Sequence, residues 1–261
     1  MSMNKTTLII TALVVASLAA LYYKTTYRSN TLISRSQVGQ TEDALVIGIN
    51  PYPPYVIIDN NDVTGFEAEL IKEIGQQLNK KVEFQNMAFT SLVASAQAGT
   101  IHAIACGIAP TAERAEKVLF TKPYVSNDPL VILTLKSHAP IRNVQDLLGK
   151  KVVVNQGYTA DMFISSIPGM NIMRLDEVAD GFMALQSGQA DAFVTARSSA
   201  QPYFNSKKES TFSATEIPGS SESIACAVSK AYPQLHSDIE RALEKLQKNG
   251  TLDALKKKWN L

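Results

Sequence analysis

The chain repeats one order of predicted strands and helices, and this repetition constrains its fold more than any other feature. The first copy consists of a strand at 45–49, a helix with apolar residues every four positions from 66 to 78, a strand at 81–84, a helix capped by Thr90 and ended by Gly99, and a strand at 101–106. The second copy consists of a strand at 151–154, the start of a helix at 159–164, a strand at 171–175, a helix at 178–186 and a strand at 190–194.

The two copies also correspond residue by residue at one place. Segment 98–105 reads Ala-Gly-Thr-Ile-His-Ala-Ile-Ala, and segment 187–194 reads Ser-Gly-Gln-Ala-Asp-Ala-Phe-Val. Strands that alternate with helices predict parallel sheets joined by right-handed crossovers. Two such units in tandem predict two α/β lobes with a cleft between them.

Two further predicted strands, at 130–135 and 223–228, connect these units. After the second of them, helically spaced apolar residues predict a helix that returns to the first lobe. We therefore expect a discontinuous lobe 1, made of 44–127 plus 222–261, and a lobe 2 made of 128–221. Paired crossings form a hinge, because two short segments absorb the change in backbone dihedrals while both sheets stay rigid.

The first 24 residues differ from the rest of the chain. Lys5 precedes an apolar run at 8–23, which is short for a membrane span and typical of an export signal. Ser17-Leu-Ala provides a small-x-small cleavage pattern, so a cleaved signal peptide is favoured over an N-terminal membrane anchor. Residues 25–43 are polar and aperiodic, which predicts a linker.

Composition argues against several classes of function. The chain has 25 Lys and Arg against 24 Asp and Glu, a net charge of +1, which does not favour nucleic acid or an acidic polymer as partner. No phosphate loop, dinucleotide fingerprint or metal-ligand spacing occurs, and no histidine lies in a nucleophile motif. We therefore predict no catalytic residue, cofactor or metal site. Cys106 and Cys226 either form a disulfide in an oxidising compartment or stay as two buried thiols.

In open α/β sheets a ligand lies beyond the carboxyl ends of the strands, at the starts of the following helices. This rule selects four segments as walls of a ligand site: 50–55, 87–90, 106–109 and 156–159. From them come the candidate ligand-binding residues Asn50, Tyr52, Phe89, Cys106, Gly107, Ala109, Tyr158 and Thr159.

Arg114 is the most informative candidate outside those segments. Thr111 is a good helix cap, so Arg114 falls in the first helical turn, where the helix dipole disfavours a cation. Its guanidinium either grips the carboxylate of a ligand in two places or pairs with a nearby surface acid such as Glu113. Gly157 to Thr159 precedes a helix, so its backbone N–H groups form a second candidate anion site or an ordinary turn.

The chain resembles the periplasmic amino acid-binding proteins of ABC importers, in the branch that binds arginine, histidine, lysine or glutamine. Three stretches carry the resemblance: Tyr52-Pro-Pro-Tyr through Thr64 to Leu70, Cys106 to Arg114 through Val118 to Tyr124, and Asn249-Gly-Thr-Leu through Lys258-Trp259. The resemblance implies the two-lobed periplasmic-binding-protein fold over 44–261. It implies that Arg114 and Thr159 hold the α-carboxylate of a ligand, that Tyr52 and Phe89 flank its side chain, and that the carbonyl of Gly107 helps hold its α-ammonium.

Three departures from the family pattern bear on the ligand. Ala196 stands where the family has an aspartate that pairs with the α-ammonium, and Ala109 replaces a hydroxyl residue. Ile49 and Asn50 stand in place of an acid that selects basic side chains. A buried ammonium without a carboxylate is costly. Either Glu222 or Asp161 substitutes for the aspartate, or the ligand is not an ordinary α-amino acid.

These observations predict a monomeric, extracytoplasmic solute-binding protein that captures a small carboxylate-bearing polar ligand and delivers it to an ABC transporter permease. Such a protein is not an enzyme, and it touches the membrane only through its N-terminal segment or the permease. The alternatives are a dehydratase-like enzyme on the same scaffold and a receptor anchored at 8–23.

Overall fold

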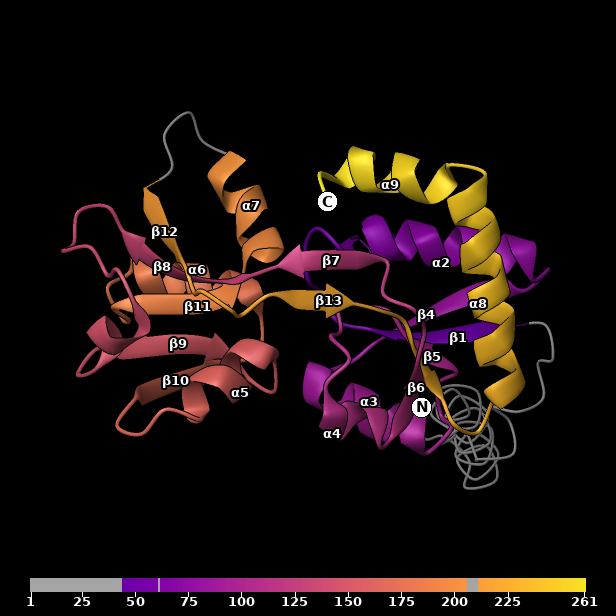
Figure 1. Ribbon diagram of the computed structural model, residues 1–261, viewed down its shortest axis with the longest axis horizontal. Helices are drawn as coiled ribbons and strands as arrows, with labels where there is room; N and C mark the ends of the chain where they lie inside the picture. Colours follow the sequence, from indigo (N-terminus) through magenta and orange to yellow (C-terminus); the bar gives the residue numbers. More distant parts are fainter. Residues whose placement is uncertain (1–43, 61, 206–210) are drawn as a thin grey trace, which may run out of the picture. The chain divides into compact units, whose positions relative to one another are not determined.

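The computed structural model describes residues 44–60, 62–205 and 211–261. The predicted signal or anchor at 1–24 and the predicted linker at 25–43 lie outside the described residues. The described chain is an α/β protein with two five-stranded sheets, each flanked by helices, as Figure 1 shows, and two two-stranded pairs.

The first sheet has the strand order β4-β1-β5-β14-β6 and forms the centre of lobe 1. Its strands are β1 (Ala44–Ile49), β4 (Lys81–Asn86), β5 (Ala103–Ile104), β6 (Val118–Phe120) and β14 (Ala227–Ser229). The helices of this lobe are α2 (Phe66–Gln77), α3 (Phe89–Gln97), α4 (Ala112–Ala115), α8 (Pro233–Lys248) and α9 (Thr251–Trp259), and a small hairpin of β2 (Ile57–Asp59) and β3 (Asp62–Thr64) precedes α2. In this sheet β1, β4, β5 and β6 run in the same direction, and β14 runs against them, because it pairs antiparallel with both β5 and β6.

The second sheet has the order β10-β9-β11-β8-β12 and forms the centre of lobe 2. Its strands are β8 (Leu130–Leu135), β9 (Lys151–Asn155), β10 (Asn171–Leu175), β11 (Ala192–Ala196) and β12 (Phe212–Glu216). Its helices are α5 (Thr159–Ser165), α6 (Val178–Gln186), α7 (Arg197–Asn205) and a 3-10 turn at Val144–Leu147. The predicted all-parallel sheets are therefore wrong in part, since β8 runs antiparallel to both β11 and β12.

The inner strands of lobe 2 are apolar on both faces because both faces are covered. Along β9, Val152 and Val154 pack in one apolar cluster with Ile164 of α5, whereas Val153 packs in the other cluster with Phe182 of α6. An unbroken apolar run is the pattern expected of a strand with helices on both sides.

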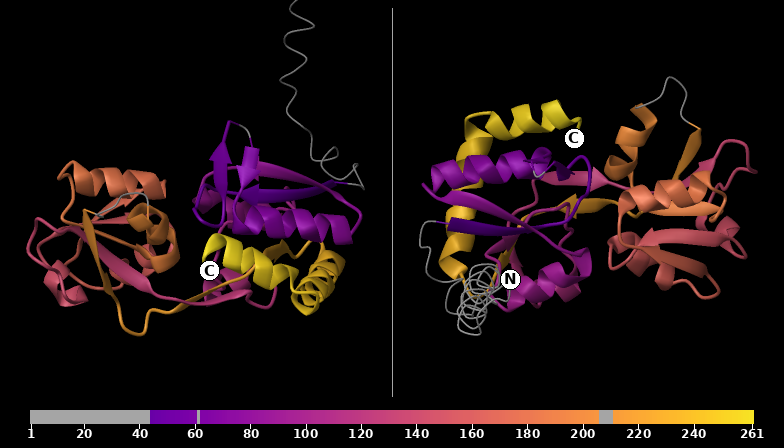
Figure 2. Two further views of the ribbon diagram at one scale, coloured as in Figure 1. Left: turned by 90° about the horizontal axis from the view of Figure 1, so that it is seen from above. Right: turned by 180° about the vertical axis from the view of Figure 1, so that it is seen from behind.

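Two segments connect the sheets. The chain leaves the first sheet through β7 (Val125–Asp128) and returns from the second through β13 (Glu222–Ile224), and these two strands pair antiparallel. Figure 2 shows the same pair of strands from two further directions. The predicted single strand at 223–228 is thus divided into β13 and β14, because its halves pair with different partners. The lobe borders at 127/128 and 221/222 stay a prediction.

Two predicted helix starts have different outcomes. Thr111 caps α4, and its side chain accepts a hydrogen bond from the backbone N–H of Arg114 at 3.3 Å. Thr90 does not cap α3, since that helix begins one residue earlier with Ala88 at the cap position and no side-chain hydrogen bond. Ala88 has an extended, non-helical backbone (φ −56°, ψ 137°), and it precedes the first helical residue without a side chain that could cap the helix.

Candidate functional site

Loops from both lobes meet at the carboxyl ends of β1, β4, β5 and β9, where the sequence predicted a ligand site. The predicted residues Tyr52, Phe89 and Tyr158 come from three of these loops and form one aromatic cluster. Phe89 meets Tyr158 edge-on with ring centroids 4.1 Å apart, and Tyr158 meets Tyr52 edge-on at 5.3 Å. Tyr52 also stacks on the fully buried Tyr55 at 5.5 Å. The cluster joins the loop after β9 in lobe 2 to the loops of lobe 1.

Arg114 lies between the two lobes and is only 5% exposed. Its Nη1 donates to the carbonyl oxygen of Ala109 at 2.8 Å, and its Nη2 donates to the carbonyl oxygen of Gly157 at 2.9 Å. The guanidinium also lies over the ring of Phe89, 5.2 Å from its centroid. Among the described acids, none forms an ion pair with Arg114. Glu113, the local alternative, pairs instead with Lys117 at 2.8 Å.

This environment leaves Arg114 short of negative charge. Burial lowers the pKa of its guanidinium, because a charged group is less stable away from water. A guanidinium has five N–H donors, and the two carbonyl oxygens account for two of them. The remaining donors suit a planar carboxylate bound in two places.

Asn50 and Tyr158 form a second contact between the lobes. The Tyr158 hydroxyl donates to Oδ1 of Asn50 at 2.9 Å, and the Asn50 side chain is nearly buried at 3% exposure. The amide nitrogen of Asn50 donates to the Met87 carbonyl at 3.2 Å and to Glu177 at 3.4 Å. Asn50 thus hydrogen-bonds from the loop after β1 in lobe 1 to two residues of lobe 2, Tyr158 and Glu177.

Gly107 and Cys106 occupy the loop after β5. Gly107 has a left-handed φ of +73°, and a Cβ at this position would lie 2.3 Å from the ring of Tyr52. Only glycine therefore allows the Tyr52 ring to lie against this loop. Cys106 is buried with 1% exposure, and burial raises the pKa of its thiol. Cys106 and Cys226 are both buried free thiols, which matches the second of the two alternatives left open by the sequence.

Glu67, which was not among the residues predicted from the sequence, forms a hydrogen bond to the Gly107 loop. Its carboxyl group accepts hydrogen bonds from the backbone N–H of Gly107 and from the hydroxyl of Tyr124, and it is fully buried. Burial raises its pKa from 4.5 to about 7. The folded protein therefore holds this proton more tightly than the unfolded chain does. Its contribution to stability is complete below pH 4.5 and is lost as the pH rises to about 7.

An open hollow of about 610 Å³ has residues of both lobes in its lining, and of the predicted ligand-binding residues it includes Ala109 and Thr159 but not Arg114, Tyr52 or Phe89. Ala109 and Thr111 of lobe 1, Thr159 of lobe 2 and Glu222 of β13 contribute to its lining. Burial raises the pKa of Glu222 to about 7, and the neighbouring Thr159 hydroxyl partly offsets this rise. An acid and a hydroxyl residue thus line one space, and Arg114 is connected to it through its hydrogen bond to the carbonyl of Ala109.

The two acids proposed to replace the missing aspartate have different surroundings in the structure. The Asp161 carboxylate already accepts three hydrogen bonds within lobe 2, from Arg174 at 2.9 Å, from the N–H of Gly157 at 3.0 Å and from Ser165 at 2.9 Å. Glu222 instead lines the hollow and lies opposite Asp128 in the β7–β13 pair.

Asp128 is a second acid that sequence reasoning missed. It accepts from the backbone N–H of Ser198 at 2.9 Å and from the hydroxyl of Tyr55 at 3.3 Å. Ala196 ends β11 and pairs with Leu130, and Leu130 is two residues along the chain from Asp128. The acid belongs to the crossing strand β7, where the family pattern gave no reason to look for it.

The histidines have structural contacts outside the hollow. Nδ1 of His102 accepts from the N–H of Val46 at 2.9 Å, and a ring nitrogen of His236 lies 2.9 Å from the Phe120 carbonyl oxygen. His102 lies in a bend before β5 and not in the strand itself. Within 44–60, 62–205 and 211–261, no group of three or more His, Cys, Asp or Glu residues could hold a metal ion.

Comparison with known proteins assigns the family. Residues 45–261 match the bacterial extracellular solute-binding proteins, family 3. The chain belongs to this family. An ancestral arginine-binding protein bound to arginine is 31% identical, with a TM-score of 0.78 over 83% of this chain and 98% of the other.

Two relatives from Bacillus subtilis carry different ligand names. The arginine-binding extracellular protein ArtP is 25% identical over 219 residues, which are 82% of this chain and 85% of the relative. The glutamine-binding protein GlnH of an ABC transporter is 27% identical over 205 residues, which are 77% and 74% of the two chains. The predicted two-lobed fold and the predicted solute-binding family are confirmed. Among the helices in the described part of the chain, none has both the length and the apolarity to span a membrane.

Proposed function

We propose that this solute-binding protein captures an amino acid, or a closely related polar carboxylate, and passes it to the permease of an ABC transporter. The observation that carries the proposal is the buried guanidinium of Arg114, which lies between the lobes with donors to spare and no acidic partner among the described residues. Relatives named for binding arginine and glutamine support an amino acid as the class of ligand. They disagree on the side chain, so the proposal leaves it open.

The ligand carboxylate binds Arg114 in two places and receives a further hydrogen bond from Thr159. The Thr159 hydroxyl lies beside Glu222 in the lining of the hollow. Free N–H groups at the start of α5 add positive potential to the same position. Tyr52 and Phe89 flank the ligand, and the carbonyl of Gly107 contributes an acceptor for its ammonium.

The ligand ammonium pairs with Glu222 in place of the missing aspartate. Glu222 lines the hollow beside Thr159, whereas Asp161 already has three donors of its own lobe. A cation next to Glu222 stabilises the ionised carboxyl group, so binding of an amino acid lowers the pKa of Glu222 from its present value of about 7. Glu222 is also the acid that a dehydratase-like enzyme would use here, and we assign it to ligand binding and not to proton transfer.

The protein works outside the cytoplasm as a monomer. The family consists of extracellular solute-binding proteins, which supports an extracytoplasmic site of action. A cleaved signal at 1–24 releases the protein into the periplasm, and an uncleaved one anchors it to the inner membrane as a receptor. Mass spectrometry of the mature N-terminus distinguishes these two forms.

A thermal-shift screen of amino acids, amines and small carboxylates tests the proposal. A ligand that binds only the folded protein raises the melting temperature in proportion to the logarithm of its concentration above Kd. We expect at least one amino acid to raise it, and simple amines without a carboxylate to have no effect. A screen in which only amines raise it would refute carboxylate capture by Arg114.

The role of Glu222 is tested with the amino acid found in the screen and its analogue lacking the amino group. Glu222→Gln weakens binding of the amino acid about tenfold or more, as expected for loss of a buried charged partner, and leaves the analogue unaffected. The matched control Asp161→Asn lowers the melting temperature but keeps the preference for the amino acid. Equal losses for both ligands in Glu222→Gln would reject the ammonium assignment.

A further inference from the structure

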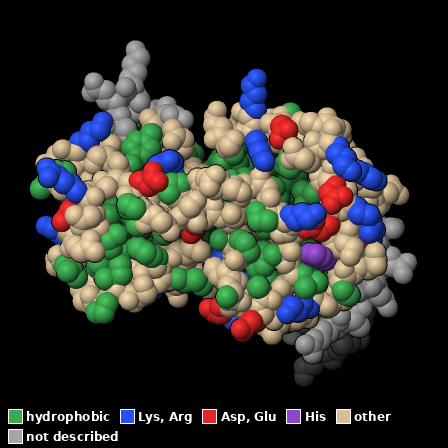
Figure 3. Space-filling model, viewed as in Figure 1, with side chains coloured by type: hydrophobic (Ala, Val, Ile, Leu, Met, Phe, Trp, Pro, Cys, Tyr) green, Lys and Arg blue, Asp and Glu red, His purple; other side chains and the backbone are tan. Residues whose placement is uncertain are grey.

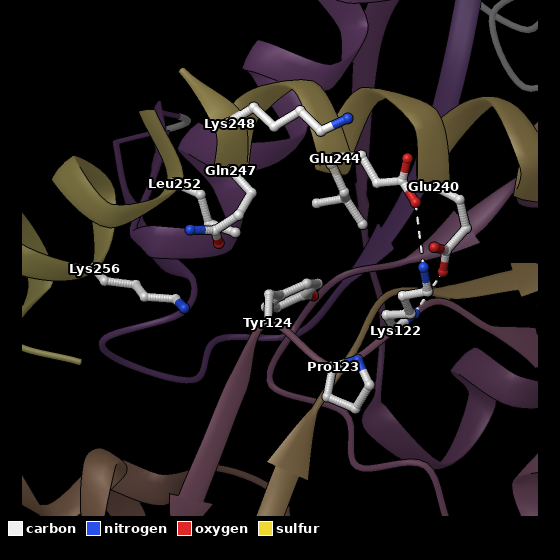
Figure 4. A pocket seen from close by; sticks show the side chains of 10 residues that line it. Lys122, Pro123, Tyr124, Glu240, Glu244, Gln247, Lys248, Leu252 and Lys256 are labelled. Carbon is white, nitrogen blue, oxygen red and sulfur yellow. Dashed lines mark hydrogen bonds and ion pairs between the residues drawn. The ribbon is translucent and has the colours of Figure 1, made fainter. Parts of the chain in front are cut away.

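A second concave site lies on lobe 1, away from the hollow between the lobes. The segment Lys122 to Tyr124 and the helices α8 and α9 enclose a groove of about 450 Å³, which we call the α8–α9 groove (Figure 4). None of its lining residues contributes to the hollow lined by Thr159 and Glu222. Its volume falls in the range of sites that hold small molecules.

The floor of the α8–α9 groove is apolar. It consists of Tyr124, Leu243 and Leu252, which are 5%, 7% and 4% exposed. The Tyr124 hydroxyl donates to Glu67 in the lobe interior, so its polar atom is already used and the ring presents carbon to the groove. An apolar surface of this kind favours the hydrocarbon part of a ligand.

The charges at the rim are unequal. Lys122 pairs with Glu244 at 3.2 Å, and its backbone N–H donates to Glu240, so both acids have partners. Lys248 of α8 and Lys256 of α9 form no ion pair with any acid in the described part of the chain. Figure 4 shows Lys256 reaching from α9 toward Tyr124. Figure 3 shows lysines and acidic groups beside apolar side chains on the same half of the molecule.

From this lining we infer that the α8–α9 groove binds a small amphipathic anion, with its apolar body on Tyr124, Leu243 and Leu252 and its carboxylate against Lys248 and Lys256. The hydrocarbon part leaves water, and the carboxylate meets the ammonium groups of Lys248 and Lys256, while the rim acids Glu240 and Glu244 already have Lys122 as their partner. The inference does not depend on which ligand enters the hollow between the lobes, because the two sites share no residue.

The groove lies next to the hinge. Tyr124 directly precedes β7, the strand that leaves lobe 1, and its hydroxyl contacts Glu67 beneath the Gly107 loop. A bound anion therefore touches the segment from which one of the two crossing strands begins.

Titration with 4-phenylbutyrate and its neutral amide tests the inference, with methyl signals of leucine followed by NMR. We expect 4-phenylbutyrate to shift Leu243 and Leu252 saturably, and the amide to bind more weakly at the same place. The double variant Lys248→Gln/Lys256→Gln weakens 4-phenylbutyrate binding about threefold or more and leaves the amide unchanged. The melting temperatures of all variants are compared first, so that an unfolded variant is not scored as a loss of binding.

The control is Lys245→Gln/Lys257→Gln, which removes two exposed lysines from the same helices outside the groove. It has the same net charge as the test variant, and we expect it to bind 4-phenylbutyrate like the unchanged protein. Absence of saturable shifts at the two leucines, or equal weakening in both double variants, would overturn the inference.

Discussion

The contact between Tyr158 and Asn50 gives the sharpest test of how lobe closure supports binding. Tyr158→Phe removes the hydroxyl that donates to Oδ1 of Asn50 at 2.9 Å and leaves this oxygen buried without that donor. In an open form, water hydrogen-bonds to both groups, so the loss falls on the closed form alone. A hydrogen bond of this kind contributes about 1 kcal/mol. Ligand affinity should therefore fall roughly fivefold.

The assay is titration calorimetry with the amino acid found in the thermal-shift screen. The matched control is Tyr232→Phe, which removes a hydroxyl that donates to the Gly99 carbonyl at 3.0 Å within lobe 1. We expect the control to lower the melting temperature slightly and to keep the affinity within twofold. Unchanged affinity in Tyr158→Phe, or equal losses in both variants, would refute the closure argument.

Three further predictions concern the interior of lobe 1. Glu67→Gln keeps the shape of the buried side chain but cannot lose a proton. The fall in stability between pH 4.5 and 7, up to ~3 kcal/mol, should therefore be absent from its pH-dependent unfolding curves. The control Glu69→Gln, on the same helix, should keep this fall. Cys106 and Cys226 should both react with a thiol reagent only after unfolding, since both are buried and burial raises the pKa of each thiol, and rapid reaction of the native protein would contradict this. Gly107→Ala should lower the free energy of unfolding by about 2–4 kcal/mol, because the new methyl group clashes with Tyr52 and the φ is unfavourable for alanine. Gly149 has a similar φ of +74° but open space around it, so Gly149→Ala should lower it by only about 1 kcal/mol.

The repeated order of strands and helices was readable because it depends on local patterns. The predicted helix at 178–186 is α6 as observed, and the predicted strand at 171–175 is β10. The direction of the strands could not be predicted from local patterns. The pairing of β8, β12 and β14 depends on which distant strands lie beside them, and no local periodicity encodes this.

The same difference between local patterns and contacts of distant residues applies to the candidate site. Residues at strand ends, such as Tyr52, Phe89 and Tyr158, were found because the carboxyl ends of strands in one sheet meet at one edge. Glu67 was missed, since an acid in the first turn of a helix normally faces solvent. It is buried here because Tyr124 and the Gly107 loop, both distant in sequence, supply its hydrogen bonds.

The central claim is that Arg114 holds the carboxylate of the ligand between the lobes. Calorimetry of Arg114→Ala against the amino acid found in the screen tests it most directly, with the exposed Arg142→Ala as the matched control for loss of one guanidinium. We predict that Arg114→Ala abolishes measurable binding while its unfolding transition remains cooperative, and that Arg142→Ala binds like the unchanged protein. Undiminished affinity in a folded Arg114→Ala variant would contradict the account.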